Sequence, residues 1–323
     1  MIRHLARALV FVGLVAATPG FAETWPSRPV TIICPFPAGI STDILTRVVA
    51  TALGDALGQQ FVVENRPGAS GNIGGAMAAK AAPDGYTLFT GTLGPTVTNK
   101  FLYRNMGYDP DQAFAPIMLL ASSPLILIGS PKIPPTNLKE LVAYARQHPG
   151  KLNAGTVGQG SQAHITLELI NQLAGTSIVH VPYRVTTQSL TDLISGELQM
   201  GWYYIPTFVP AIQAGKVRGL AVTSTERVRD LPDVPTVEQS GFPGFEASGW
   251  NALFAPAGTP PEVLAKVNGI VNAYLKSDAG RVQVEEKLQM TRLGGTPERL
   301  KAFLASETAK WGKVIKDTHV TVQ

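Results

Sequence analysis

The stretch that decides the fold is I-I-C-P-F-P-A-G-I-S-T-D, residues 32–43. Its β-branched, apolar start predicts a short buried strand over 30–34. The prolines and the glycine that follow break the strand, and apolar residues then recur at helical spacing until Gly58, a typical stop. Ser41 and Thr42 are of the types that cap helix N-termini. We therefore expect a strand, a stiff turn and a capped helix.

Such a turn suits a small anion. The first N–H groups of a helix have no intrahelical acceptor, and they lie at the positive end of the helix dipole. The turn, residues 35–40, contains no nucleophile and no basic side chain, which indicates that it holds an anion rather than reacts with it. An ordinary strand-to-helix turn explains the same residues, and this alternative stays open.

The same design occurs again more than a hundred residues later. Residues 152–155 predict a strand, T-V-G-Q-G-S at 156–161 forms the turn, Ser161 is a good helix cap, and Gly175 is the expected stop. If these two turns face each other across a cleft, they are suited to hold both ends of one small acid.

The strands and helices alternate along most of the chain. Further strands are expected at 60–64, 86–90, 114–121, 124–129, 178–181, 198–204, 217–222 and 250–255, with helices between many of them and two at the C-terminus from Pro261 and Thr296. This order predicts an α/β fold with parallel pairing and ligands at the carboxyl ends of the strands. Chain crossings near Ser123 and Phe245 predict a discontinuous first domain, 23–122 plus 245–323, and an inserted second domain, 123–244.

Residues 1–22 have the parts of a secretory signal peptide. Arg3 and Arg7 precede an apolar run that is too short to span a bilayer, and Gly20-Phe21-Ala22 is a small-x-small cleavage site. A retained N-terminal anchor is the alternative. No later run approaches spanning length, so we expect a soluble protein outside the cytoplasm. The formal net charge of +4 says little about nucleic acid or lipid, and neither is expected as a partner.

Cysteine and histidine usage indicates neither a disulfide nor a metal. Cys34 is the only cysteine and lies in a predicted apolar strand, so an inert buried thiol is expected. The five histidines are scattered without ligand spacing, and we predict no metal and no cofactor. The cluster Trp202-Tyr203-Tyr204 is either half-buried core or a stacking wall for a planar ligand, and both explanations stay open.

Many ordered motifs give the chain a specific resemblance to a known family. They are W-P-S-R-P at 25–29, P-F-P-A-G at 35–39, V-E-N-R-P-G-A at 63–69, P-D-G-Y-T-L at 83–88, P-G-K-L-N at 149–153, H-V-P-Y at 180–183, D-V-P-T at 233–236 and A-P-A-G-T-P at 255–260. With these motifs the mature chain resembles the periplasmic substrate-binding proteins of tripartite tricarboxylate transporters, also called Bug receptors.

The resemblance implies a fold and a function. The fold is a type II, clamshell-like periplasmic binding protein with two α/β domains, each a mostly parallel sheet flanked by helices, and a ligand cleft between them. The function is capture of a small di-, tri- or aromatic carboxylate by hinge closure and delivery to the large and small membrane subunits of a permease. A monomeric, non-enzymatic periplasmic receptor is expected.

In the family, backbone amides of the two Gly-rich loops hold the carboxylate. The resemblance thus nominates, in the first loop, Phe36, Pro37, Ala38, Gly39, Ser41, Thr42 and Asp43, and in the second loop Thr156, Gly158, Gln159, Gly160, Ser161 and His164. Thr92 and Tyr203 complete the predicted contacts. Two of these residues have a structural alternative, because Asp43 is also a first-turn acid favoured by the helix dipole and His164 is also explained as a satisfied helix histidine.

Three departures from the family pattern bear on the ligand. Ile40 stands where the family usually has a second glycine, Arg184-Val185 replaces the usual Lys-Gly, and Tyr203 falls where many members have aspartate. Less acid and more aromatic surface favour an aromatic or bulky carboxylate. Citrate-like and C4-dicarboxylate ligands stay open.

Two other classes of protein are alternatives to a transport receptor. A secreted hydrolase would need a nucleophile, but the glycine-flanked Ser70 and Ser161 do not complete G-x-S-x-G, and no phosphate-binding glycine motif is present. A sensor that presents its closed form to a histidine kinase would use the same cleft, and the residues do not distinguish it from a transport receptor.

Overall fold

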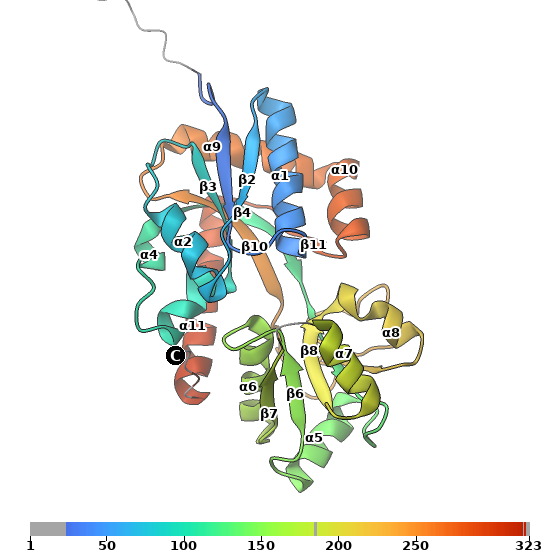
Figure 1. Cartoon of the computed structure of the whole chain (residues 1–323). Helices are drawn as coiled ribbons and strands as arrows, with labels where there is room; N and C mark the ends of the chain where they lie inside the picture. The colour runs from blue at the N-terminus through green and yellow to red at the C-terminus, as the bar shows by residue number, and fades with distance from the viewer. Residues whose placement is uncertain (1–23, 184–185, 319, 321–323) are drawn as a thin grey trace, which may run out of the picture.

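The protein is described by a computed structural model that covers residues 24–183, 186–318 and 320. It consists of two β-sheets, each flanked by helices, one above the other in Figure 1. The predicted signal peptide and the Arg184-Val185 departure lie outside the described residues. Within those residues, no helix has the length and apolar character needed to cross a membrane.

The first sheet has six strands in the order β11-β4-β10-β3-β1-β2. Their bounds are β1 Val30–Cys34, β2 Phe61–Asn65, β3 Thr87–Thr92, β4 Phe114–Ser123, β10 Gly249–Pro256 and β11 Thr291–Arg292. β1 pairs in parallel with β2 and β3, whereas β10 runs antiparallel to β3 and β4 and β11 runs antiparallel to β4.

The second sheet has five strands in the order β7-β6-β8-β5-β9. Their bounds are β5 Leu125–Gly129, β6 Asn153–Thr156, β7 Val179–Pro182, β8 Met200–Tyr204 and β9 Arg218–Val222. β6 pairs in parallel with β7 and β8, and β5 runs antiparallel to β8 and β9.

The expected α/β fold is confirmed, but both sheets are mixed rather than mostly parallel. The antiparallel pairings involve strands at the two points where the chain crosses between the sheets, from β4 to β5 and from β9 to β10. Consecutive parallel strands of one sheet need a long crossover connection, usually a helix, whereas a strand that arrives from the other sheet does not. The first sheet takes strands from both sides of the second sheet in the sequence. This order agrees with an inserted second domain, and the domain bounds themselves stay a prediction.

Helices cover both sheets. Their bounds are α1 Ser41–Leu57, α2 Asn72–Ala79, α3 Asn99–Leu102, α4 Pro110–Ala113, α5 Leu138–Gln147, α6 Gln162–Ala174, α7 Thr186–Ser195, α8 Val209–Gln213, α9 Pro261–Lys276, α10 Asp278–Arg281 and α11 Pro297–Thr318. Gly58 and Gly175 follow α1 and α6 in the left-handed conformation, with φ of 66° and 59°. Both predicted stops are therefore confirmed, because glycine adopts this conformation without steric cost.

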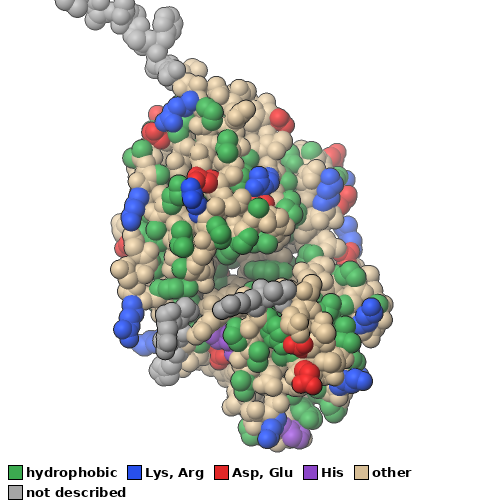
Figure 2. All heavy atoms as spheres, viewed as in Figure 1, with side chains coloured by type: hydrophobic (Ala, Val, Ile, Leu, Met, Phe, Trp, Pro, Cys, Tyr) green, Lys and Arg blue, Asp and Glu red, His purple; other side chains and the backbone are tan. Residues whose placement is uncertain are grey.

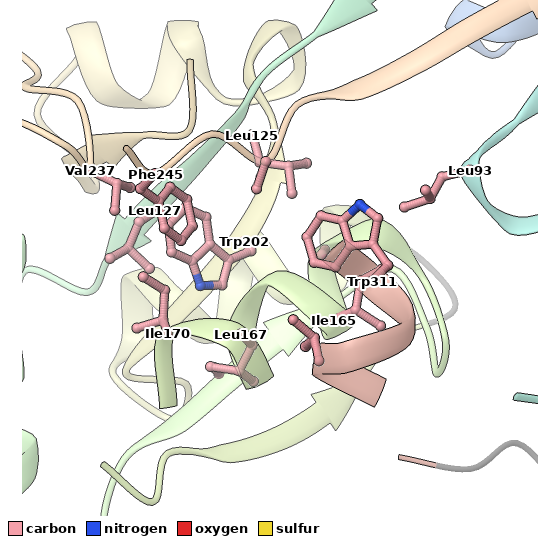
Figure 3. Packing of buried hydrophobic residues seen from close by; sticks show 14 of the residues in the cluster. Leu93, Leu125, Leu127, Ile165, Leu167, Ile170, Trp202, Val237, Phe245 and Trp311 are labelled. Atoms are coloured by element: carbon pink, nitrogen blue, oxygen red, sulfur yellow. The ribbon is translucent and has the colours of Figure 1, made fainter. Parts of the chain in front are cut away.

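One hydrophobic core continues from the first sheet into the second. Figure 3 shows Trp202 of β8 close to Leu127 of β5 and Phe245, and Trp311 of α11 beside Ile165 of α6. The carboxylate of Glu307, also on α11, is 3% exposed and accepts hydrogen bonds from the indoles of Trp311 (3.0 Å) and of Trp250 on β10 (2.9 Å). The C-terminal helix thus joins the two halves along with the two chain crossings.

The buried cysteine and the aromatic cluster take core positions. Cys34 is free and fully buried, as expected, and burial raises the pKa of its thiol. Trp202 and Tyr203 are 0% and 1% exposed, and Tyr204 is partly buried against the core. The stacking wall is therefore wrong for Trp202 and Tyr203, whose surface is already covered by protein.

Candidate ligand-binding site

The two predicted turns lie at comparable positions in the two halves. The first connects β1 to α1 and the second connects β6 to α6, and in Figure 1 the lower end of α1 and the upper end of β6 lie on either side of the space between the sheets. Figure 2 shows the surface hollowed there, with side chains at its edges that are mainly hydrophobic or uncharged. The turns thus occupy opposite sides of one cleft.

The first loop is fixed by Asp43 rather than by a capping serine or threonine. The N-cap position is Ile40 and has no side-chain cap, so the predicted capping role of Ser41 and Thr42 is wrong. Instead the Gly39 amide donates to Asp43 Oδ2 at 2.8 Å. The carboxylate of Asp43 therefore replaces the missing cap from the first turn of α1.

Asp43 is saturated by protein donors. Its side chain is 2% exposed, Arg47 pairs with both of its oxygens at 3.0 and 3.1 Å, and Asn65 Nδ2 donates to Oδ1 at 2.8 Å. Burial raises the pKa of Asp43, but the Arg47, Gly39 and Asn65 hydrogen bonds together hold it below its ordinary value. We interpret Asp43 as the anchor of the loop and not as a ligand contact, because its oxygens already have partners.

Asn65 also fixes the front of the loop. Its Nδ2 donates to the carbonyl oxygen of Phe36 at 3.0 Å, and its Oδ1 accepts from Arg47 at 3.0 Å. Neither Arg47 nor Asn65 was among the predicted site residues. The V-E-N motif at the end of β2 could have indicated Asn65 as a site residue, because the carboxyl end of β2 lies beside that of β1 in the parallel pair.

The second loop repeats the arrangement with a histidine. The Gly160 amide donates to Nδ1 of His164, four residues later, at 3.0 Å, as Gly39 donates to Asp43. Ser161 is the N-cap of α6, as predicted, since its Oγ accepts from the His164 amide at 3.3 Å and donates to Gly158 O at 2.7 Å.

A stacked pair of histidines, His164 buried and His180 partly buried, supports this loop. The rings of His164 and His180 stack with centroids 3.7 Å apart, and His180 Nε2 lies 2.6 Å from Thr156 Oγ1, which accepts from the Gly158 amide. Burial lowers the pKa of both histidines to about 4, with the neighbouring His180 contributing for His164. Both rings are therefore neutral at pH 7, which leaves His164 Nδ1 free to accept. His180 was missed because it lies on β7, and only the fold brings it to the loop.

The internal bonds change which donors face the cleft. The amides of Gly39, Gly158 and Gly160 already have acceptors, so they are not the free donors that the sequence suggested. We expect the first turns of α1 and α6 to supply them instead, at Ser41 and Thr42 and at Gln162 and Ala163, because N–H groups there lack intrahelical partners. Gln159 makes contacts of its own within the protein.

The remaining nominated residues differ in position. Pro37 and Ala38 are exposed at the tip of the first loop, and Thr92 is partly exposed at the end of β3. Tyr203 is instead enclosed, with its ring stacked on Phe208 at 4.5 Å and its hydroxyl against Gly155 of β6, where an added Cβ would lie 2.2 Å away. The predicted ligand contact of Tyr203 is therefore replaced by a supporting position behind the second loop.

The charge around both loops is low. Residues 35–42 and 156–163 contain no charged side chain, and Asp43 is neutralised by Arg47. An anion in the cleft would meet backbone dipoles and two helix N-termini. Within the described residues, no group of three or more metal-ligating side chains gathers at one place.

Comparison with known proteins identifies the family. Residues 45–320 match the model of the tripartite tricarboxylate transporter family receptor. The chain belongs to this family. It is 35% identical to protein BugT of Bordetella pertussis over 98% of both chains. Among solved structures, Rpa4515 of R. palustris with adipate has a TM-score of 0.81 at 38% identity, over 92% of this chain and 99% of that one. The periplasmic binding protein BugD has a TM-score of 0.78 at 33% identity, over 93% of this chain and 100% of that one.

Membership settles the class of this receptor. It is a solute-binding protein of the tripartite tricarboxylate transporter family, whose members are periplasmic binding proteins and not enzymes. The hydrolase alternative also lacks support in the site, because Ser161 Oγ is engaged as a helix cap and Ser70 Oγ is hydrogen-bonded to the Tyr103 hydroxyl at 3.1 Å.

The histidine pair of this receptor predicts acid sensitivity. In the unfolded chain the pKa of a histidine is near 6.5, whereas burial lowers the pKa of His164 and of His180 to about 4 in the folded protein. Between these values the unfolded chain binds more protons, so stability falls as the pH drops from 6.5 to about 4. We expect His180→Gln, which keeps a donor for Thr156 but does not titrate, to make this fall in melting temperature shallower.

The control is His148→Gln, at an exposed histidine on the end of α5. It removes one histidine, as His180→Gln does, and leaves the stacked pair intact. An acid slope that is the same in His180→Gln and wild type would contradict the role given to the pair.

Proposed function

We propose that this receptor captures a dicarboxylate whose two carboxylates are separated by an apolar segment. The proposal rests on two loops with the same internal hydrogen bond at the N-terminal ends of α1 and α6. In the first loop the Gly39 amide donates to the Asp43 carboxylate, and in the second the Gly160 amide donates to the His164 ring. Each helix end suits one carboxylate. Two such ends on opposite sides of a cleft suit a ligand with one carboxylate at each end.

Apolar side chains beside the loops favour the apolar segment. Ile40 and Ile44 are 41% and 40% exposed at the first loop, and Val157 is 43% exposed in the second. Exposing a large hydrophobic side chain to water is unfavourable. Burying it against methylene groups of a ligand gains a free energy of roughly 25 cal/mol per Å² of apolar surface. A tricarboxylate would bring a third charge to loops without a cation of their own. Adipate, which the relative Rpa4515 binds, has the favoured pattern.

Capture occurs by hinge closure at the two chain crossings. Leu125 and Thr223 hold these crossings together, since Leu125 N donates to Thr223 Oγ1 at 2.8 Å and Thr223 N donates to Leu125 O at 2.9 Å. The amide of Ala247 joins them through Thr223 O at 3.2 Å. A ligand that contacts both loops only in the closed form shifts the population towards it.

The moving bodies are residues 23–122 plus 245–323 and residues 123–244. The receptor acts as a monomer in the periplasm and delivers its ligand to the large and small subunits of the permease. The first loop that holds the ligand comprises Phe36 to Thr42, and the second comprises Thr156 to Ala163. Presentation to a sensor kinase would use the same closed form, and the family favours the permease.

The test is a thermal-shift panel on the mature protein. Adipate, pimelate, malate, citrate and benzoate are compared at equal concentration, and a ligand at about 100 times its Kd adds roughly 2.7 kcal/mol of stability. We expect adipate or pimelate to raise the melting temperature most. A maximal shift with malate or citrate would contradict the apolar segment, and a maximal shift with benzoate would contradict the second carboxylate.

A matched variant locates the selectivity. Ile40→Thr keeps the branch at Cβ and replaces the ethyl group with a hydroxyl, and it should reduce the preference for adipate over malate about threefold to tenfold. Ile73→Thr is the control, because Ile73 is also exposed, at 55%, and lies on α2, outside both loops. An unchanged preference in Ile40→Thr would remove Ile40 from the site.

A further inference from the structure

Polar side chains form a row beneath α1 on one face of the first sheet. The hydroxyls of Thr46 on α1 and Thr90 on β3 are hydrogen-bonded, with 3.0 Å between the two Oγ1 atoms, and both residues are fully buried. Thr46 Oγ1 also lies 2.7 Å from the carbonyl oxygen of Thr42, one turn nearer the start of the helix. The row therefore runs from the core towards the first loop.

Thr92 is the next member of this row on β3. Residues two apart in a strand lie on the same face, about 6.6 Å from each other. Thr42 precedes Thr46 by one helical turn, about 6 Å along the axis of α1. Thr92 therefore lies level with the first turn of α1, at the carboxyl end of the strand, where its side chain is partly exposed.

Asn251 lies beside Thr92. The two residues are direct partners in the antiparallel pair of β10 and β3, so their side chains lie on the same face with Cβ atoms about 5 Å apart. Asn251 follows the second chain crossing by two residues, because β10 begins at Gly249. Asn251 therefore lies near the second chain crossing, beside the end of β3.

The amide of Asn251 has unused bonding capacity. The residue is 4% exposed, and its Oδ1 is enclosed without a hydrogen-bond partner among the described residues. An enclosed, unpaired polar atom costs about 1–3 kcal/mol, so such atoms are few in folded proteins and call for a physical reason. Because Oδ1 is an acceptor, the missing partner is a donor, such as a water or hydroxyl that enters with the ligand.

We propose that Asn251, together with Thr92, contacts the carboxylate held at the N-terminus of α1. The amide offers two N–H donors to the carboxylate and one acceptor to a water or hydroxyl that accompanies it. This inference rests on the proposed function, because it places the ligand at the first loop. It adds a contact from the return strand, so that the ligand would touch the hinge as well as both loops.

The test measures binding in variants that remove the amide or the hydroxyl without changing size much. Asn251→Leu and Thr92→Val are compared with wild type by calorimetry, using whichever of adipate, pimelate, malate, citrate and benzoate the wild type binds best. We expect Asn251→Leu to weaken binding about tenfold to a hundredfold and Thr92→Val about threefold to tenfold, the effects of losing hydrogen bonds to a charged group.

The matched control is Thr90→Val, one step deeper in the same row. It removes the bond to Thr46, so it should lower the melting temperature and leave the affinity within twofold. A folded Asn251→Leu protein whose affinity also stays within twofold of wild type would overturn the inference and leave the proposed function intact.

A second variant, Asn251→Asp, tests the inference in case Asn251→Leu does not fold. Asn251→Asp keeps the size of the side chain and places a negative charge beside the carboxylate, so binding should be lost at pH 7. Retained binding in Asn251→Asp would overturn the inference. If the wild type binds none of the five acids, the proposed function fails and this inference fails with it.

Discussion

Asp43→Ala is expected to weaken adipate binding at least tenfold and to lower the free energy of unfolding by about 2–3 kcal/mol. Removing one partner of a buried ion pair typically costs 3–5 kcal/mol, and the value is smaller here because Arg47 is half exposed. The Gly39 amide and the Asn65 side chain also lose their acceptor. The first loop would then have no fixed shape in which to present its donors.

Chemical denaturation and calorimetry measure the two effects separately. Asp55→Ala is the control, since Asp55 is an exposed acid on the same helix, and it should change stability by less than about 0.5 kcal/mol. Asp43→Asn, which can still accept from Gly39, should fall between wild type and Asp43→Ala. If Asp43→Ala binds adipate as wild type does, Asp43 does not shape the site.

Ala38→Asp is expected to abolish binding while the protein stays folded. Ala38 is exposed at the tip of the first loop, so the change brings a second carboxylate close to the place that we propose for the ligand carboxylate. Like charges at an interface cost several kcal/mol, which corresponds to a loss of at least a hundredfold. Gly39 and Gly160 are poorer positions for this test, because their φ angles of +86° and +73° favour glycine over residues with a side chain.

The control for Ala38→Asp is Ala38→Asn, which has the same size and no charge. It should bind adipate within about threefold of wild type, by calorimetry in the same buffer. Raising the salt concentration should partly restore binding to Ala38→Asp, because salt screens exposed charges. Equal affinities of the two variants would show that no anion is held at the tip of this loop.

Local patterns in the sequence predicted the elements of the fold. The β-branched run at 30–34, the helical spacing after Ser41 and the stops at Gly58 and Gly175 all act within a few residues of the chain, and each appears in the structure. The mixed pairing could not be predicted in this way. The direction of β5 and β10 depends on which strand they meet after crossing between the sheets.

The sequence predicted where the two loops of the candidate site lie better than it predicted the hydrogen bonds that fix them. Both loops follow parallel strands and precede helices, so their place at the carboxyl ends of the strands follows from the chain order. The bonds that fix them come from Asn65 and His180, which are 22 and 24 residues from their partners Asp43 and Thr156. Tyr203 was misplaced because an aromatic residue at a strand end fits a core and a cleft equally well.

The most direct test of a site shared by the two loops is a crystal structure of the mature protein with adipate, or with whichever acid gives the largest thermal shift. We predict one carboxylate within hydrogen-bond distance of the Ser41 or Thr42 amide and the other end of the ligand at the first turn of α6. A ligand bound through one loop only, or outside the space between the sheets, would contradict capture by closure of the two halves.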